Sequence, residues 1–149
     1  MLVVVGAERP TNPPEFGIPD VYMGSMDEDA ALSRLYSAAD VTLLPSVQDN
    51  LPNMAMESLA CGTPVVAFDV GGIPDMVEHQ ANGYLARAFD AEDFAEGIRW
   101  VLETKERHAA LGARAARKVS EEFSIETVAR RHLELYAELT VPRGRGANA

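Results

Sequence analysis

Two carboxylates, Asp49 and Glu57, stand on either side of a predicted helix start near the middle of the chain. Asp49 lies in a polar turn, and Pro52 fits the first helical position, where a missing N–H costs no hydrogen bond. The first backbone N–H groups of a helix lack partners within the helix, and the helix dipole adds partial positive charge there. Such a helix start can bind an anion. The donors expected here are the N–H groups of Asn53, Met54 and Ala55.

The motif continues beyond this helix. The segment ACGTPVV at 60–66 ends the helix at Gly62 and begins an apolar strand, and GGIPD follows at 71–75. Together with the seven residues that separate Asp49 from Glu57, these segments resemble the carboxy-terminal, donor-binding domain of retaining glycosyltransferases with the GT-B fold. Weaker similarity extends from Val3 to Leu85, so the resemblance covers most of the chain before its last helices.

The resemblance implies a role for each residue around the helix start. Glu57 matches the acid that accepts hydrogen bonds from both ribose hydroxyls of a nucleotide-diphosphate sugar. Asn53 and Met54 stand where helix N–H groups hold the diphosphate. Asp49 matches the acid near the reacting centre, which contacts the transferred sugar and orients it without acting as a nucleophile. The further donor contacts that the resemblance implies are Asn50 and Leu51 in the turn, and Met23 and Ser25 beside the nucleobase.

Two other features have competing interpretations. Gly71 and Gly72 form either a simple tight turn or, by resemblance, a site of sugar and acceptor contacts. Cys61 has no neighbouring His or Cys, so we expect a small buried apolar residue and no metal or nucleophilic chemistry. The three histidines are predicted to lie on the surface. We expect neither a metal site nor a cofactor.

The chain departs from the family pattern in three ways. Asp49 is one methylene shorter than the Glu that the family usually has, so its carboxylate must lie closer to the sugar or reach it through water. The turn Asn50-Leu51-Pro52 replaces a frequent Gly-aromatic-Gly. The family's acceptor domain, first strand and diphosphate-binding basic pair have no counterpart, since Arg9 is the only basic residue before Arg34. We therefore expect a truncated or split enzyme that binds its donor weakly and transfers nothing without the missing acceptor domain or a partner chain.

Composition narrows the function classes. The 149 residues suffice for one domain, predicted over 1–140, with a disordered tail over 141–149. The net charge of −10 disfavours nucleic acid and anionic membranes, which both attract basic proteins. Cys61 is the only cysteine, and no apolar run is long enough to insert into a membrane. The expected location is the cytoplasm.

Helices alternate with short apolar strands along the chain. The strands predicted at 2–5, 41–44 and 64–68 are mostly apolar and show no alternation of polar and apolar residues, which is typical of a parallel sheet covered on both faces. The predicted fold is a doubly wound, Rossmann-like α/β sheet, one half of a GT-B architecture. Ligands of such sheets bind beyond the carboxyl ends of the strands, where Asp49 and Gly71 fall.

Three functions are consistent with these residues. The first is the donor-binding half of a retaining glycosyltransferase that transfers a hexosyl group to a glycan or lipid-linked acceptor. The second is a fragment of a nucleotide-sugar epimerase with the GT-B fold, and the third is a nucleotide-binding or interaction module without catalysis. Fold alone does not choose among them.

Overall fold

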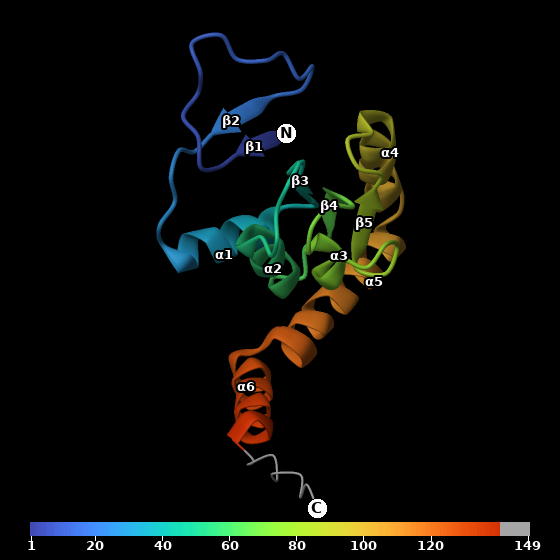
Figure 1. Ribbon diagram of the computed structural model, residues 1–149. Helices are drawn as coiled ribbons and strands as arrows, with labels where there is room; N and C mark the ends of the chain where they lie inside the picture. The colour runs from blue at the N-terminus through green and yellow to red at the C-terminus, as the bar shows by residue number, and fades with distance from the viewer. Residues whose placement is uncertain (141–149) are drawn as a thin grey trace, which may run out of the picture.

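Strands and helices alternate along residues 1–140, the part of the chain that the computed structural model describes (Figure 1). The predicted tail at 141–149 lies outside these residues. The elements in chain order are β1 (Leu2–Val4), β2 (Asp20–Tyr22), α1 (Asp29–Ala38), β3 (Thr42–Leu44), α2 (Asn53–Ala60), β4 (Val65–Phe68), α3 (Ile73–Met76), β5 (Gly83–Ala86), α4 (Ala91–Leu102), α5 (Lys105–Lys118), the π-helix η1 (Val119–Phe123) and α6 (Ile125–Thr140).

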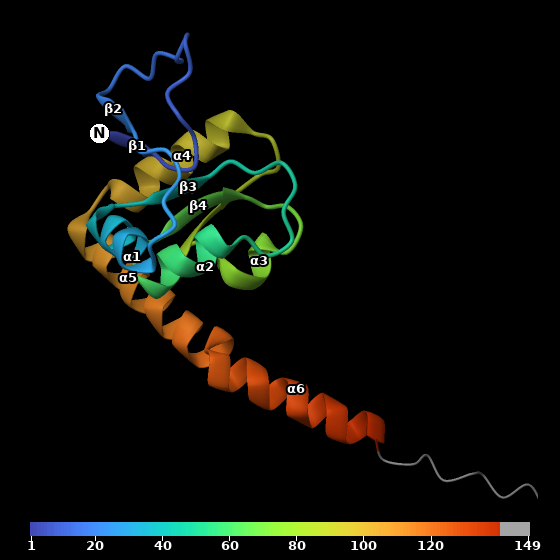
Figure 2. The ribbon, with the colours of Figure 1, turned by 90° about the vertical axis from the view of Figure 1, so that its left-hand side faces the viewer.

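The three strands β3, β4 and β5 form a parallel sheet with β4 in the middle. Every residue of β4 is buried, and successive side chains enter different cores because they point to opposite faces of the sheet. Val65 and Ala67 pack with residues of α2, α3 and α5, whereas Val66 and Phe68 pack with residues of α4 and α5. Figure 2 shows α4 on one side of the strands and α2 and α3 on the other. The sheet is therefore doubly wound, as the apolar strands predict.

The strands β1 and β2 form a second parallel sheet, separate from the first. The single sheet expected from the sequence is thus in two parts. Within residues 1–140, β1 pairs only with β2 and β3 pairs only with β4, so each of these two strands has one unpaired edge. In both views β1 lies between β2 and β3 (Figures 1 and 2). The residues of β1 are only half-buried, although they are apolar throughout. One edge of each sheet therefore faces the other across the interval between β1 and β3.

Two helices differ in detail from what the residue pattern predicts. The sequence predicts one helix over 107–122 and another from Asp27; the first is α5 followed by η1, and the second is α1, which begins at Asp29. Ser124 precedes α6 as a cap, since its Oγ accepts a hydrogen bond of 3.3 Å from the Thr127 N–H. No side chain of α6 is buried, and the helix extends away from the two sheets (Figure 2).

Candidate functional site

Helix α2 begins one residue later than the sequence predicts. Pro52 is the N-cap, with an extended backbone at φ −65° and ψ 120°. Its carbonyl oxygen accepts hydrogen bonds from the Ala55 N–H at 3.0 Å and the Met56 N–H at 3.3 Å. The prediction that Ala55 offers its N–H to a ligand is therefore wrong, because that group is bonded within the helix. The N–H groups of Asn53 and Met54 have no acceptor within residues 1–140, and both residues are exposed.

The other end of α2 is closed by a Schellman motif. Gly62 has a φ of +76°, its N–H donates to the Leu59 carbonyl at 3.0 Å, and the Thr63 N–H donates to the Ser58 carbonyl at 3.0 Å. The left-handed conformation at this position favours glycine. The motif turns the chain directly into β4, as the segment at 60–66 predicts.

Buried hydroxyls fix the orientation of α2 against its neighbours. Ser58 is fully buried; its Oγ is 2.8 Å from the Thr42 Oγ1 and 3.0 Å from the Thr63 carbonyl oxygen. The Thr63 hydroxyl donates to the Tyr36 carbonyl at 2.6 Å. These bonds tie α2 to the start of β3 and to the end of α1. The first turn of α2 therefore has a fixed position at the carboxyl edge of the sheet.

Glu57 lies on the exposed side of α2, one turn after Asn53. Residues four apart share one face of a helix, so Glu57 lies on the same face as Asn53. The buried Tyr36 of α1 lies beside it. Burial, and then the charge and hydrogen bonding of Glu57, raise the pKa of Tyr36 to about 12. Glu57 therefore lies beside Tyr36 of α1, one turn after the open start of α2.

Asp49 follows β3 and is half-buried. Its backbone carbonyl accepts a hydrogen bond of 3.2 Å from the Gly72 N–H, which follows β4. Within residues 1–140 its carboxylate forms no hydrogen bond or ion pair to protein. The structure thus brings Asp49, Asn50, Gly71 and Gly72 together at the carboxyl edge of the sheet, the edge expected for a ligand.

The other predicted donor contacts are exposed. Leu51 is 54% exposed in the turn before α2. Met23 and Ser25 follow β2, and their hydrogen bonds go to Val4 and Asp27, not to the turn at 45–52. The structure therefore places Met23 and Ser25 at the carboxyl end of the second sheet, without linking them to α2.

Sequence reasoning missed the tyrosine beside Glu57. Tyr36 occupies an apolar position of α1 and reads as ordinary core. The available signal was the hydroxyl itself, because a buried tyrosine usually finds a polar partner for its O–H.

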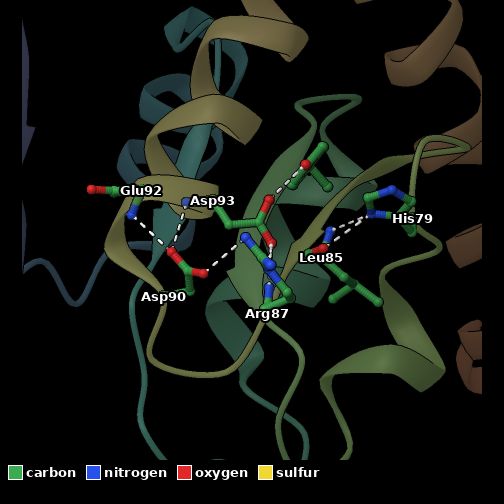
Figure 3. Close-up of polar contacts among 7 residues, drawn as sticks. His79, Leu85, Arg87, Asp90, Glu92 and Asp93 are labelled. Atoms are coloured by element: carbon green, nitrogen blue, oxygen red, sulfur yellow. Dashed lines mark hydrogen bonds and ion pairs between the residues drawn. The ribbon is translucent and has the colours of Figure 1, made fainter.

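Two arginines near the sheet edges are already paired. Arg9 forms an ion pair of 2.7 Å with Asp20 and lies 5.3 Å from the centre of the Tyr22 ring. Arg87, after β5, lies 2.9 Å from the Asp90 carboxylate and 3.1 Å from that of Asp93 (Figure 3). These contacts give both arginines a structural role.

The Arg87 contacts join β5 to the start of α4. The sequence predicts Asp90 as a helix cap, because Asp is favoured at this position and Glu92 and Asp93 follow in the first turn. The Asp90 side chain accepts hydrogen bonds from the Glu92 and Asp93 N–H groups, which confirms this cap. The hydrogen bond from the Arg87 backbone N–H is the main cause that lowers the pKa of Asp93.

Two kinds of feature are absent from residues 1–140: a metal-binding cluster and a membrane-spanning helix. No three side chains among His, Cys, Asp and Glu are grouped so that they could hold a metal ion. None of the helices described combines the length and the apolar character that crossing a membrane requires.

Known proteins match both the sequence and the fold. Residues 19–118 match the family model described as glycosyl transferases group 1. The D-inositol 3-phosphate glycosyltransferase of Thermobispora bispora is 36% identical over 137 residues, which are 87% of this chain and 32% of that protein. The chain thus spans about a third of the length of the curated relatives that it matches.

Solved structures agree with this match. The sucrose-phosphate synthase of Thermosynechococcus elongatus superposes with a TM-score of 0.73 and 32% identity, over 80% of this chain and 30% of that one. Alr3699/HepE of Anabaena, solved in complex with UDP, gives 0.72 and 25% over 80% of this chain and 32% of that one. The same Anabaena protein was also solved in complex with UDP-glucose. The family match covers the open start of α2, both acids and the Gly71–Gly72 turn, and the chain therefore belongs to the glycosyl transferases group 1 family, with the fold of one half of a GT-B enzyme.

Proposed function

We propose that residues 1–140 form the domain that binds the nucleotide-diphosphate sugar in a retaining hexosyltransferase acting on a glycan or lipid-linked acceptor. The observation that carries this proposal is the open start of α2, where two N–H groups have no acceptor within residues 1–140 and Glu57 lies one turn further along the exposed side of the helix. The complexes of the Anabaena protein with UDP and UDP-glucose support it, because that protein shares the fold of this chain.

Each part of the donor has a matching group in this site. The Asn53 and Met54 N–H groups suit the diphosphate, because helix starts bind anions through N–H donors and the dipole. The Glu57 carboxylate can accept hydrogen bonds from two neighbouring ribose hydroxyls. Hydrogen bonds to a charged group contribute about 1.5–3 kcal/mol each.

Asp49 orients the transferred sugar in this proposal. Its carboxylate has no protein partner within residues 1–140, so it can accept hydrogen bonds from sugar hydroxyls. In the transfer, the bond from the sugar to the diphosphate breaks, a bond from the sugar to the acceptor oxygen forms, and the proton of the acceptor hydroxyl passes to the leaving diphosphate. Negative charge grows on the leaving diphosphate, where the α2 N–H groups stabilise it electrostatically.

Binding the acceptor requires polypeptide outside this chain. The relatives are about three times as long as the matched region. The free edges of the parallel strands β1 and β3 face each other, so we propose that one further parallel strand from the rest of the enzyme, or from a partner chain, pairs with both edges. The acceptor domain would come from the same source. This chain alone should bind donor weakly, without transfer, and we place the enzyme in the cytoplasm.

The ribose assignment is tested with Glu57→Ala. The variant should lose about tenfold or more in UDP affinity, because it removes charged hydrogen-bond acceptors. Its affinity for pyrophosphate, which has no ribose, should change by less than about twofold. Calorimetric titration of both ligands measures the two effects.

Glu134→Ala is the matched control, since Glu134 is an exposed glutamate on α6. It removes the same charge and should leave both affinities unchanged. Equal losses of UDP and pyrophosphate affinity in Glu57→Ala would refute the ribose assignment.

A further inference from the structure

We propose that Gly71 and Gly72 form a backbone seat that fixes the Asp49–Asn50 turn, and that they are positioning residues for the sugar-orienting carboxylate. The second half of this statement rests on the proposed function. The first half rests on the packing of two loops alone.

Gly72 is required by its surroundings and not by its backbone conformation. Its φ of −98° and ψ of 8° are accessible to other residues. A Cβ atom at this position would nevertheless overlap the Asn50 carbonyl oxygen and lie 3.0 Å from the Asn50 carbonyl carbon. The absence of a side chain at Gly72 therefore makes room for the turn that carries Asp49.

Gly71 meets the preceding residue of the same turn. A Cβ atom there would overlap the Asp49 carbonyl oxygen and lie 2.9 Å from the Asp49 carbonyl carbon. Its φ of +55° adds a conformation that side chains disfavour. The carbonyl groups of Asp49 and Asn50 thus lie against Gly71 and Gly72 respectively. The Gly72 N–H completes the seat by donating to the Asp49 carbonyl at 3.2 Å.

The seat is anchored in the core. Gly72 is the N-cap of α3, whose residues Ile73 and Met76 are almost completely buried. In the turn itself Asn50 and Leu51 are exposed, and the next buried residue is Pro52 at the start of α2. The two glycines therefore tie the Asp49 backbone to β4 and α3.

The other close-packed glycines serve different contacts. Added Cβ atoms at Gly83, Gly97 and Gly112 would meet Val65, Tyr84 and Gly62 respectively, and none of these three lies in the Asp49–Asn50 turn. Gly17 has a φ of +70° and nothing within 4 Å of an added Cβ atom. Gly17→Ala therefore introduces backbone strain without a steric clash, and it is the control for Gly71→Ala.

The first test measures the seat without any ligand. Gly72→Ala should shift the backbone NMR signals of Asp49 and Asn50, while the signals of β5 and α4 stay in place. Gly71→Ala should do the same, and Gly17→Ala should not. In the wild-type chain, the Gly72 amide should exchange with solvent more slowly than an unbonded amide, a check that needs no variant. Unchanged Asp49 and Asn50 signals in folded Gly72→Ala, or rapid exchange at Gly72, would overturn the seat.

The second test measures the consequence for the sugar. Gly72→Ala should keep its UDP affinity within about twofold, because Asn53, Met54 and Glu57 are unchanged. The ratio of UDP-glucose affinity to UDP affinity should fall by about tenfold, the effect of lost hydrogen bonds to a carboxylate. Equal losses for both ligands would overturn the positioning role. If wild-type protein binds neither ligand, the proposed function and the positioning role fail, whereas the seat is still decided by the first test.

Discussion

The carboxylate of Glu57 acts on a neighbouring residue even without a ligand. Burial comes first and Glu57 second among the causes that raise the pKa of Tyr36 to about 12. Tyr36 ionises near 10 in an unfolded chain, so the neutral phenol favours the folded state. This contribution to stability is complete below pH 10 and is lost as pH rises from about 10 to about 12.

Glu57→Gln should lower the pKa of Tyr36, because the negative charge beside the phenol is gone. The pKa should stay above 10, because burial remains the larger cause. An NMR titration of the tyrosine ring carbons measures the Tyr36 pKa in the wild-type protein and in Glu57→Gln. Glu134→Gln is the matched control. If Glu57→Gln left the Tyr36 pKa unchanged, the claim that the Glu57 carboxylate lies beside the Tyr36 phenol would be wrong.

Candidate site residues could be found in the sequence where their partners are close along the chain. Asp49 and Glu57 could be singled out because they lie at a fixed spacing around one predicted helix start. Tyr36 could not, because its partner lies on a different helix. The reason for Gly72 is also hidden, since its backbone conformation is ordinary and only the fold brings Asn50 against it.

At the scale of elements, the caps and core strands were the readable parts. Asp90 caps α4 and Gly62 ends α2 as predicted, because both effects are local. The π-helix η1 was missed, because no residue pattern distinguishes it from the α-helix that precedes it. The division of the sheet was missed as well, since apolar strands indicate burial but not which strand lies beside which.

Ser58 holds α2 in place, so Ser58→Ala should destabilise the domain. The change removes a fully buried hydroxyl and leaves the Thr42 hydroxyl and the Thr63 carbonyl with one partner fewer. The expected loss is about 1–3 kcal/mol in the free energy of unfolding. Urea denaturation measures this loss.

The control is Ser37→Ala, at an exposed position of α1, which should change stability by less than about 0.5 kcal/mol. Similar values for both variants would contradict the role given to Ser58.

At the scale of the whole molecule, the proposed donor site lies at the edge of one sheet, while two surfaces remain uncovered within residues 1–140. The first is the interval between β1 and β3, and the second is α6, where Ile125, Leu133 and Leu139 are 80%, 68% and 72% exposed. Exposed apolar surface of this extent is typical of a contact site.

The central claim is that the start of α2, together with Glu57, binds the nucleotide part of the donor. It is tested most directly by titrating UDP into the isotope-labelled chain and following the backbone amide signals. The signals of Asn53, Met54 and Glu57 should move together and saturate at roughly millimolar UDP, a binding free energy of about −4 kcal/mol. No movement of these three signals at millimolar UDP, or movement confined to other elements, would contradict the claim.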